Sequence, residues 1–308
     1  MISKNSRIYI AGHNGMVGSA CWRLLDREGY SNLIGRSSTE LDLKNQSKVE
    51  EFFKEEKPEV VINAAARVGG IWANNEYQYE FLIDNLLIQN NLIKTSLENN
   101  VRKFIFLGSS CIYPKMAPQP MKEEYLLTGP LETSNQWYAI AKISGIKLIE
   151  SIRNQFNKDY VSLMPTNLYG PGDNYDLKTS HVLPALIRKF NDAKEKNLDK
   201  VIVWGTGKPL REFLHVDDLA SAVLFSMKNK LTEPLYNIGT GDELSIEKLS
   251  QKIKQMTSFK GRIVFDISKP DGTPRKLLDI SKMEKMGWTR KIKLDEGIKK
   301  TIKNYLGC

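Results

Sequence analysis

The chain of 308 residues is poor in cysteine and has no long hydrophobic run. Its three cysteines, Cys21, Cys111 and Cys308, lie far apart, which excludes a disulfide framework and a cysteine-rich zinc site. No apolar run approaches the roughly 20 residues that a membrane span needs, and the first residues lack the apolar stretch of a signal peptide. We therefore expect a protein of a reducing, cytoplasmic compartment, with no membrane partner and no metal.

Composition and charge exclude further classes. Hydrophobic residues make up 41% and charged residues 26% of the chain, as in soluble globular proteins, which excludes disordered, collagen-like and coiled-coil proteins. The formal net charge of +9 favours anionic partners, although a solvated basic surface is the more ordinary explanation. No arginine–glycine tract or zinc-finger spacing accompanies this charge, so we expect no nucleic-acid partner.

Short apolar runs alternate with longer amphipathic segments in the first half of the chain. The runs predict strands at Arg7–Ala11, Asn32–Ile34, Val60–Ala64, Lys103–Leu107 and Tyr160–Met164. The amphipathic segments predict helices at Gly15–Glu28, Lys44–Lys57, Glu76–Asn99 and Asn135–Asn157. This alternation indicates an α/β protein with a Rossmann-type, doubly wound parallel sheet. After Pro165 the rhythm loosens, and we expect a smaller C-terminal lobe.

Three glycines follow the first predicted strand in the pattern G-x-x-G-x-x-G. Gly12 permits the tight turn, Gly15 lets the backbone approach a pyrophosphate, and Gly18 allows the helix to pack on the strand. The helix that follows offers free N–H groups to phosphates. This position between strand and helix predicts a dinucleotide site that also includes His13, Asn14, Met16 and Val17.

The residues after the second predicted strand bear on the choice of dinucleotide. NAD-binding proteins usually place an acid there to hold the ribose 2′-hydroxyl. This chain has Arg36, Ser37 and Ser38 instead, which suit a 2′-phosphate, so we predict a preference for NADP(H). Glu40 and Asp42 lie slightly further along and are the competing ribose ligands.

Tyr138 and Lys142 are four residues apart on a predicted helix and project from one face. Reduction of a ketone by hydride needs a proton for the forming alkoxide, and a tyrosine supplies it if a cation lowers its pKa from about 10. Lys142 is the candidate cation. The alternative is that Tyr138 and Lys142 are an ordinary pair on the helix surface. The glycine motif upstream disfavours this alternative.

A serine and a cysteine follow the fourth predicted strand. If the backbone stays extended there, Ser109 and Cys111 share one face and Ser110 turns away. Ser109 then reaches the substrate carbonyl beside Tyr138. Cys111 is unnecessary for simple reduction, and a small apolar residue is the commonest role of a lone cysteine.

Together, the glycine motif, the strand-end serine and the Y-x-x-x-K pair resemble the extended short-chain dehydrogenase/reductase family over essentially the whole chain. Within it, four segments resemble the enzymes that epimerise C3 and C5 of GDP-4-keto-6-deoxy-D-mannose and reduce its C4 ketone to give GDP-L-fucose. They are Ser109–Pro114, Pro165–Pro171, Arg211–Asp218 and Lys269–Lys276. This resemblance implies a GDP-sugar substrate and NADPH as cofactor.

The chemistry explains the residues that the resemblance implies. Inverting C3 or C5 beside a ketone requires a base on one face and an acid on the other. The resemblance assigns the base to Cys111 as thiolate and the acid to His181, with Ser109 and Tyr138 stabilising the enolate oxygen. The pKa of Cys111 must then fall from about 8.5, for which His181 or Lys142 is the expected cause.

The resemblance implies further contacts on both sides of the reacting carbon. The substrate contacts are Lys189, Trp204, Arg211 and Asp271, with Arg275 and Lys276 as additional cations. The cofactor contacts are Leu107, Gly108, Ser109, Ser110, Lys142, Pro165, Thr166, Asn167, Leu168 and His181. Asn14 stands where the family often has arginine, which leaves Arg36 as the obvious cation for a 2′-phosphate. We expect His215 to be structural and Asp217 to cap a helix.

The resemblance also implies a domain division and an assembly. We expect an NADP-binding domain at 1–170 and 215–238 and a nucleotide-sugar lobe at 171–214 and 239–308. Two predicted helices, Glu76–Asn99 and Asn135–Asn157, would pair across a two-fold axis into the four-helix bundle of a homodimer. An apolar stripe fits this pairing, although burial against the chain's own sheet fits equally; it comprises Phe81, Leu82, Leu86 and Ile93. Two alternatives remain: another nucleotide-sugar epimerase or reductase, and a non-catalytic NADP-binding sensor.

Overall fold

Six parallel strands form the central sheet, in the order β10-β5-β4-β3-β1-β2. A computed structural model describes residues 2–269 and 271–307, so Pro270 of the Lys269–Lys276 motif and Cys308 lie outside the described residues. The strands are β1 (Ile8–Ala11), β2 (Leu33–Ile34), β3 (Val60–Asn63), β4 (Lys103–Leu107), β5 (Asp159–Pro165) and β10 (Leu235–Ile238). The five predicted strands and the doubly wound fold are confirmed, and β10 joins the sheet from a later part of the chain.

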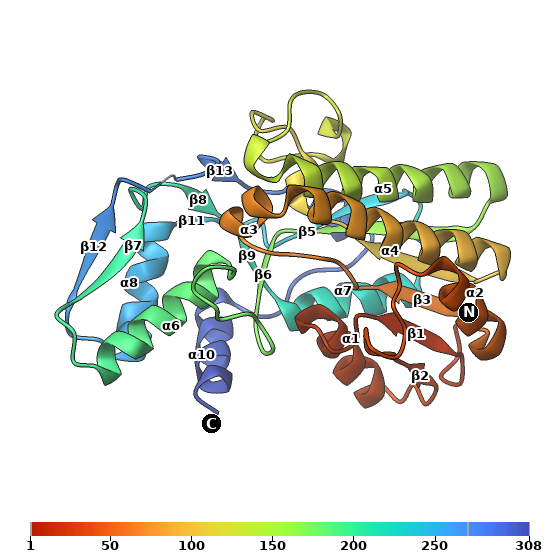
Figure 1. Ribbon diagram of the computed structural model, residues 1–308, viewed down its shortest axis with the longest axis horizontal. Helices are drawn as coiled ribbons and strands as arrows, with labels where there is room; N and C mark the ends of the chain where they lie inside the picture. The colour runs from red at the N-terminus through yellow and green to blue at the C-terminus, as the bar shows by residue number, and fades with distance from the viewer. Residues whose placement is uncertain (1, 270, 308) are drawn as a thin grey trace.

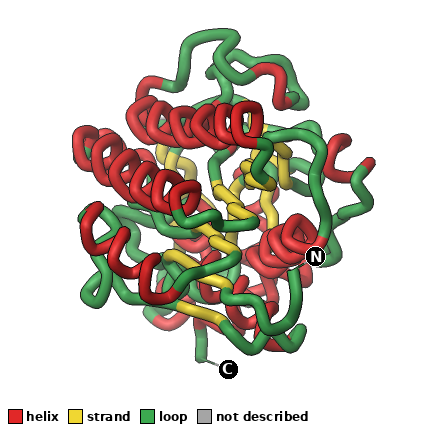
Figure 2. Tube along the Cα trace, turned by 90° about the vertical axis from the view of Figure 1, so that its right-hand side faces the viewer, coloured by secondary structure: helices red, strands yellow, loops and turns green. Residues whose placement is uncertain are grey.

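Helices cover both faces of this sheet (Figures 1 and 2). One face carries α1 (Met16–Arg27) and α7 (Val216–Lys228), whose Leu25 and Leu219 enter one core cluster. The other face carries α2 (Gln46–Glu56), α4 (Gln78–Glu98) and α5 (Gln136–Phe156). Because both faces are covered, β1, β3 and β4 are buried at every residue, which explains their unbroken apolar runs.

The apolar stripe on α4 lies mainly inside the chain. Phe81 is 2% exposed and Ile93 is 0% exposed, and Ile93 belongs to the core cluster between α4 and the sheet. The interpretation of Phe81 and Ile93 as an exposed dimer stripe is therefore wrong. Their burial follows from the packing of α4 against its own sheet and against α5, where the Gln89 side chain donates to the Ala141 carbonyl at 2.6 Å.

A second, smaller group of elements has a core of its own. It contains α6 (Val182–Glu195), α8 (Ile246–Thr257), α10 (Leu294–Tyr305) and the strand pair β7 (Lys200–Trp204) and β12 (Arg262–Asp266). A three-stranded sheet of β11 (Leu244–Ser245), β8 (Leu210–Arg211) and β13 (Arg275–Lys276) lies beside it. These elements support the expected two-part division, which we retain as a proposal. Residues 277–288 depart from it, because Leu278, Met283 and Trp288 enter the core clusters of the larger part.

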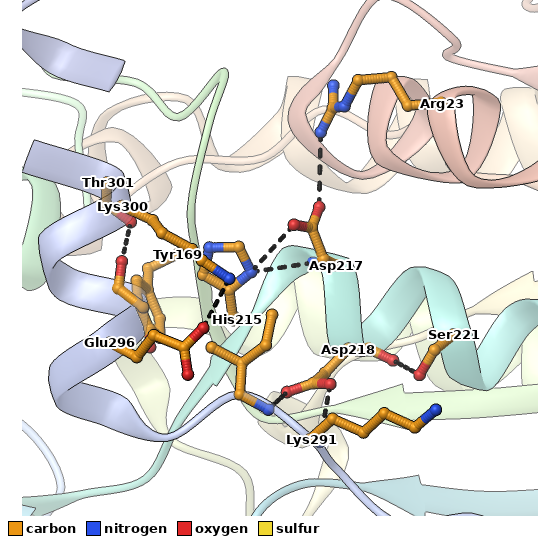
Figure 3. A network of polar contacts seen from close by, with 12 residues as sticks. Arg23, Tyr169, His215, Asp217, Asp218, Ser221, Lys291, Glu296, Lys300 and Thr301 are labelled. Atoms are coloured by element: carbon orange, nitrogen blue, oxygen red, sulfur yellow. Dashed lines mark hydrogen bonds and ion pairs between the residues drawn. The ribbon is translucent and has the colours of Figure 1, made fainter. Parts of the chain in front are cut away.

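Two short parallel strands and a polar network join the two parts. β6 (Asn167–Tyr169) pairs with β9 (Phe213–His215). Figure 3 shows the network at the start of α7, where Asp218 accepts from the backbone N–H groups of Lys291 and Ile292 at 2.9 Å each. Arg23 of α1 pairs with Asp217 at 3.6 Å. The cap of α7 is His215, whose Nδ1 accepts from the Asp217 N–H at 3.2 Å, so the prediction of Asp217 as the cap is wrong by two residues.

Several elements are too short for sequence periodicity to predict them. They are the helix α3 (Ile71–Glu76), the 3-10 turns η1 (Ser110–Ile112), η2 (Glu123–Tyr125) and η3 (Thr133–Asn135), and the helix α9 (Ser281–Lys285). Among the described helices, none combines the length and the apolar character that a membrane crossing requires.

Candidate active site

The glycine motif forms a tight loop between β1 and α1. Gly12 has a φ of +78°, and a Cβ there would lie 2.9 Å from the Ala64 carbonyl oxygen. A Cβ at Gly18 would lie 2.1 Å from the Gly12 carbonyl oxygen. No side chain caps the N-terminus of α1, so its N–H groups are available to an anion. His13 packs against Trp22 with ring centroids 5.6 Å apart, which supports a role in shaping the loop.

A cavity of about 650 Å³ opens beside this loop, and we call it the glycine-loop cavity. Gly12, Gly15 and Arg36 line it, as the sequence predicts for the cofactor. Ser38, predicted with Arg36 to suit a 2′-phosphate, lines it as well, and so does Asp42, a competing ribose ligand. The other lining residues had no predicted role: Leu41, Leu43, Lys44, Ala64, Ala65, Ala66, Arg67, Asp84 and Ile88. The narrow loop, the uncapped helix and the adjoining space fit a dinucleotide.

Ser109 and Cys111 meet in a second cavity, of about 350 Å³, which we call the serine–cysteine cavity. The expectation of extended backbone is wrong, because Ser109 caps the 3-10 turn η1 and its Oγ accepts from the Cys111 N–H at 3.3 Å. Serine favours such cap positions because its oxygen satisfies a free N–H. The turn nevertheless brings Ser109 and Cys111 to one cavity and buries Ser110.

Tyr138 lines the same cavity from α5, but Lys142 does not lower its pKa. Burial raises the pKa of Tyr138 well above its ordinary value, Cys111 adds to this, and a hydrogen bond with Ser109 offsets only part. The Lys142 Nζ donates to the Leu107 carbonyl at 2.8 Å and lies 5.8 Å from the Tyr138 ring centroid. Burial lowers the pKa of Lys142 to about 7. The phenol is therefore fully protonated at neutral pH.

The Cys111 thiol has cationic neighbours from the other part of the chain. Its Sγ lies 3.5 Å from the Lys276 Nζ and 3.3 Å from the Asn135 Nδ2. Burial opposes ionisation, but Lys276, the Ser109 side chain and Arg211 together hold the pKa of Cys111 below its ordinary value. The expected cause, His181 or Lys142, is thus wrong. Lys276 and Arg211 are register partners on β13 and β8, which sets the two cations side by side.

His181 precedes α6 and lines the serine–cysteine cavity with Cys111. The residue is exposed to solvent. Loss of hydration beside the cavity and the charge of Lys276 lower the pKa of His181, so the neutral imidazole predominates at pH 7 in the free protein.

The predicted substrate residues line this same cavity. Lys189 donates to the Ile202 carbonyl at 3.0 Å and sits 5.3 Å from the Trp204 ring centroid. Trp204 is 52% exposed, which is unusual for a core aromatic. Asp271 accepts from the N–H and hydroxyl of Thr206 at 2.7 and 2.8 Å. With Arg211, these residues line one wall, and their binding role stays a prediction.

The remaining predicted residues divide between the cavity and the framework. Asn167 and Leu168 line the serine–cysteine cavity, and Asn167 donates to the Glu212 carbonyl at 2.8 Å. Eleven predicted cofactor residues line neither cavity: His13, Asn14, Met16, Val17, Gly18, Leu107, Gly108, Ser110, Lys142, Pro165 and Thr166. Arg275 pairs with Glu243 at 2.6 Å, outside both cavities.

Sequence reasoning missed one wall of the serine–cysteine cavity. Val68, Gly69, Gly70, Ile71 and Trp72 line it, and Val68, Ile71 and Trp72 are 62, 46 and 43% exposed. The two glycines after β3 were an available signal, because ligands in such folds bind beyond the carboxyl ends of the strands. Asn135 also lines this cavity, but no motif in the sequence around it indicates a functional residue.

Known proteins resemble this chain in sequence and in fold. The model of the NAD dependent epimerase/dehydratase family matches residues 8–239. The chain is 52% identical to GDP-L-fucose synthase 1 of Arabidopsis thaliana, over 99% of this chain and 95% of that protein. It is 49% identical to GDP-L-fucose synthase of Escherichia coli strain K12, over 97 and 96%. A GDP-L-fucose synthetase structure from Naegleria fowleri bound to NADP superposes with a TM-score of 0.92 at 31% identity, over 100% of this chain and 94% of that one.

Proposed function

This chain belongs to the NAD dependent epimerase/dehydratase family, and we propose that it converts GDP-4-keto-6-deoxy-D-mannose to GDP-L-fucose with NADPH. The reaction epimerises C3 and C5 and then reduces the C4 ketone. One observation carries the proposal: Ser109, Cys111, Tyr138 and His181 line a single cavity that also carries cations and an exposed tryptophan.

Epimerisation needs a base and an acid on opposite faces of the sugar. The Cys111 thiolate takes the proton from C3 or C5 and becomes a thiol, while the electron pair moves to the C4 oxygen as an enolate. Ser109 and Tyr138 stabilise that oxygen by hydrogen bonds. The His181 imidazolium returns a proton to the opposite face of the same carbon. A diphosphate in the cavity adds negative charge, which favours the imidazolium form of His181.

Reduction uses the same oxygen. NADPH supplies hydride to C4, and the loop of Gly12, Gly15 and Gly18 with the N-terminus of α1 would hold its pyrophosphate. Tyr138 donates the proton to the forming alkoxide. Its raised pKa keeps the phenol protonated at neutral pH, but it also makes the phenol a weaker acid than a tyrosine whose pKa a cation lowers. Lys142 holds the Leu107 carbonyl, and so fixes the strand end that leads to Ser109.

Other lining residues of the same cavity suit a nucleoside diphosphate. Arg211 and Lys189 supply positive charge for the two phosphates, and Trp204 offers an exposed aromatic face to the base. Asp271 is held by Thr206 and accepts hydrogen bonds.

We propose a homodimer through α4 and α5. Leu87 on α4 and Ile140 on α5 are 38 and 41% exposed on these two packed helices, which supports an apolar contact there. Sedimentation velocity at micromolar concentration should give twice the chain mass, whereas a monomer would contradict the proposal. A reducing compartment such as the cytoplasm suits the free thiol of Cys111.

The direct test offers the purified protein GDP-4-keto-6-deoxy-D-mannose and NADPH and identifies the sugar formed. We expect GDP-L-fucose, with one NADPH oxidised per product. Tyr138→Phe should abolish substrate-dependent NADPH oxidation. GDP-6-deoxy sugars unaltered at C3 and C5 would indicate a simple reductase instead. Absence of NADPH oxidation in the unaltered protein would indicate a sensor.

A further inference from the structure

The glycine-loop cavity has three cationic side chains among its described lining residues: Arg36, Lys44 and Arg67. A cofactor with a 2′-phosphate brings negative charge that the 2′-hydroxyl cofactor lacks. Discrimination between the two cofactors therefore depends on whether a neighbouring carboxylate compensates the charge of the cation near the ribose.

Arg36 is the cation nearest the end of β2, and its guanidinium is already engaged. It forms an ion pair with Glu56, the last residue of α2. Its Nη1 donates to the Gly35 carbonyl at 2.9 Å, and its guanidinium carbon lies 5.5 Å from the Phe52 ring centroid. The side chain is thus held in place while the Glu56 carboxylate compensates its charge.

Lys44 and Arg67 are compensated as well. Both pair with the Asp84 carboxylate, at 3.7 and 3.1 Å. Asp42 adds a further carboxylate to the lining. All three cations of this cavity therefore have an acidic partner, and Asn14 contributes no charge from the glycine loop.

From this arrangement we propose that Glu56 is a specificity-determining residue, which keeps the preference for NADPH over NADH weak by neutralising Arg36. The inference rests on the proposed function only in that the glycine-loop cavity binds a nicotinamide dinucleotide. A 2′-phosphate beside Arg36 gains the attraction of one guanidinium but meets the repulsion of the adjacent carboxylate. A cofactor with a 2′-hydroxyl carries no charge at this position, so that pair of charges should not change its affinity.

The test measures binding rather than turnover. Isothermal titration calorimetry at fixed low salt gives the Kd of NADP+ and of NAD+ for the unaltered protein, for Glu56→Gln and for Glu55→Gln. Glutamine at 56 keeps an amide oxygen to accept from Arg36 and removes only the charge. Glu55 is an exposed neighbour on the same helix, so Glu55→Gln is matched in charge and position.

We expect NADP+ and NAD+ to bind the unaltered protein within about tenfold of each other. Glu56→Gln should tighten NADP+ binding by about fivefold, which corresponds to about 1 kcal/mol, the size of one partly exposed charge interaction. It should leave NAD+ binding unchanged, and Glu55→Gln should change neither. The double variant Arg36→Gln/Glu56→Gln should lose the gain.

Two results would overturn the inference. One is a preference for NADP+ above a hundredfold in the unaltered protein. The other is a Glu56→Gln variant with an unaltered thermal unfolding midpoint whose NADP+ affinity is unchanged or weaker. Failure of the proposed function looks different: both cofactors bind, the Glu56 effect appears, and GDP-4-keto-6-deoxy-D-mannose is not converted.

Discussion

At the scale of single residues, the account depends on how the pKa of one half-buried thiol, that of Cys111, is kept low. Burial alone would raise the pKa of Cys111, as it does for Cys21, where no cation is close enough to prevail. At Cys111 the Lys276 ammonium is 3.5 Å from the sulfur and Arg211 is its register partner. The same lysine lowers the pKa of His181, so it influences both groups proposed for epimerisation.

Removal of that cation should change the pH dependence of epimerisation. The lowered pKa of Cys111 means that the thiolate is present above this pKa and is lost as the pH falls through it. Lys276→Met should raise this pKa, so the ascending limb of C3 and C5 proton exchange should move to higher pH. Lys276→Arg should keep the limb close to its original pH, because the positive charge stays. Lys282 on α9 pairs with Glu124, and Lys282→Met should not move the limb. An unmoved limb in Lys276→Met would show that another group controls the thiol.

The sequence could point to the residues proposed to react, but not to the neighbours that shift their pKa values. Ser109, Cys111 and Tyr138 sit in motifs that local spacing or resemblance reveals. Lys276 lies 165 positions from Cys111, and its place depends on tertiary contacts such as the pairing of β13 with β8, which sets it beside Arg211. Burial likewise decides the pKa of Tyr138, and burial depends on packing that no local pattern contains.

At the scale of elements, the loop between β1 and α1 is the most tightly constrained. The helix passes so close to the loop that a side chain at Gly18 would overlap the backbone of Gly12 and His13. At Gly15 the space is wider, because a Cβ there would lie 3.4 Å from the Gly12 carbonyl oxygen. The two glycines therefore serve different purposes, one for packing and one for ligand approach.

This difference predicts unequal effects on stability. Gly18→Ala should lower the free energy of unfolding by about 1–3 kcal/mol, because backbone atoms must move to admit the methyl group. Gly15→Ala should change it by less than about 0.5 kcal/mol. Urea denaturation followed by circular dichroism measures both. Equal losses would contradict the packing role of Gly18.

Long elements could be predicted and short ones could not. The β4 boundaries were predicted to the residue, and α1, α2, α4 and α5 differ from expectation by at most two residues at either end. The missed elements α3 and η1 are six and three residues long, too short for periodicity to register. Their conformations also depend on contacts outside the segment, since the N–H at the start of α3, that of Gly70, donates to the Thr179 carbonyl.

At the scale of the whole molecule, the groups proposed to react, and those that tune them, come from both parts of the chain. Cys111 and Tyr138 belong to the larger part, whereas Lys276, Arg211 and His181 come from later segments. Buried Glu212 ties these segments together, because its carboxylate accepts from the N–H groups of Thr240, Gly241 and Leu278. The proposed active site thus exists only when both parts are assembled.

The most direct test of this account is deuterium incorporation during turnover in D2O. With GDP-4-keto-6-deoxy-D-mannose and NADPH, nuclear magnetic resonance of the sugar product should show solvent deuterium at both C3 and C5. Cys111→Ser should lose that label while NADPH oxidation continues. A product of the unaltered protein without deuterium at either carbon, or full labelling in Cys111→Ser, would contradict the assignment of the thiolate as the base.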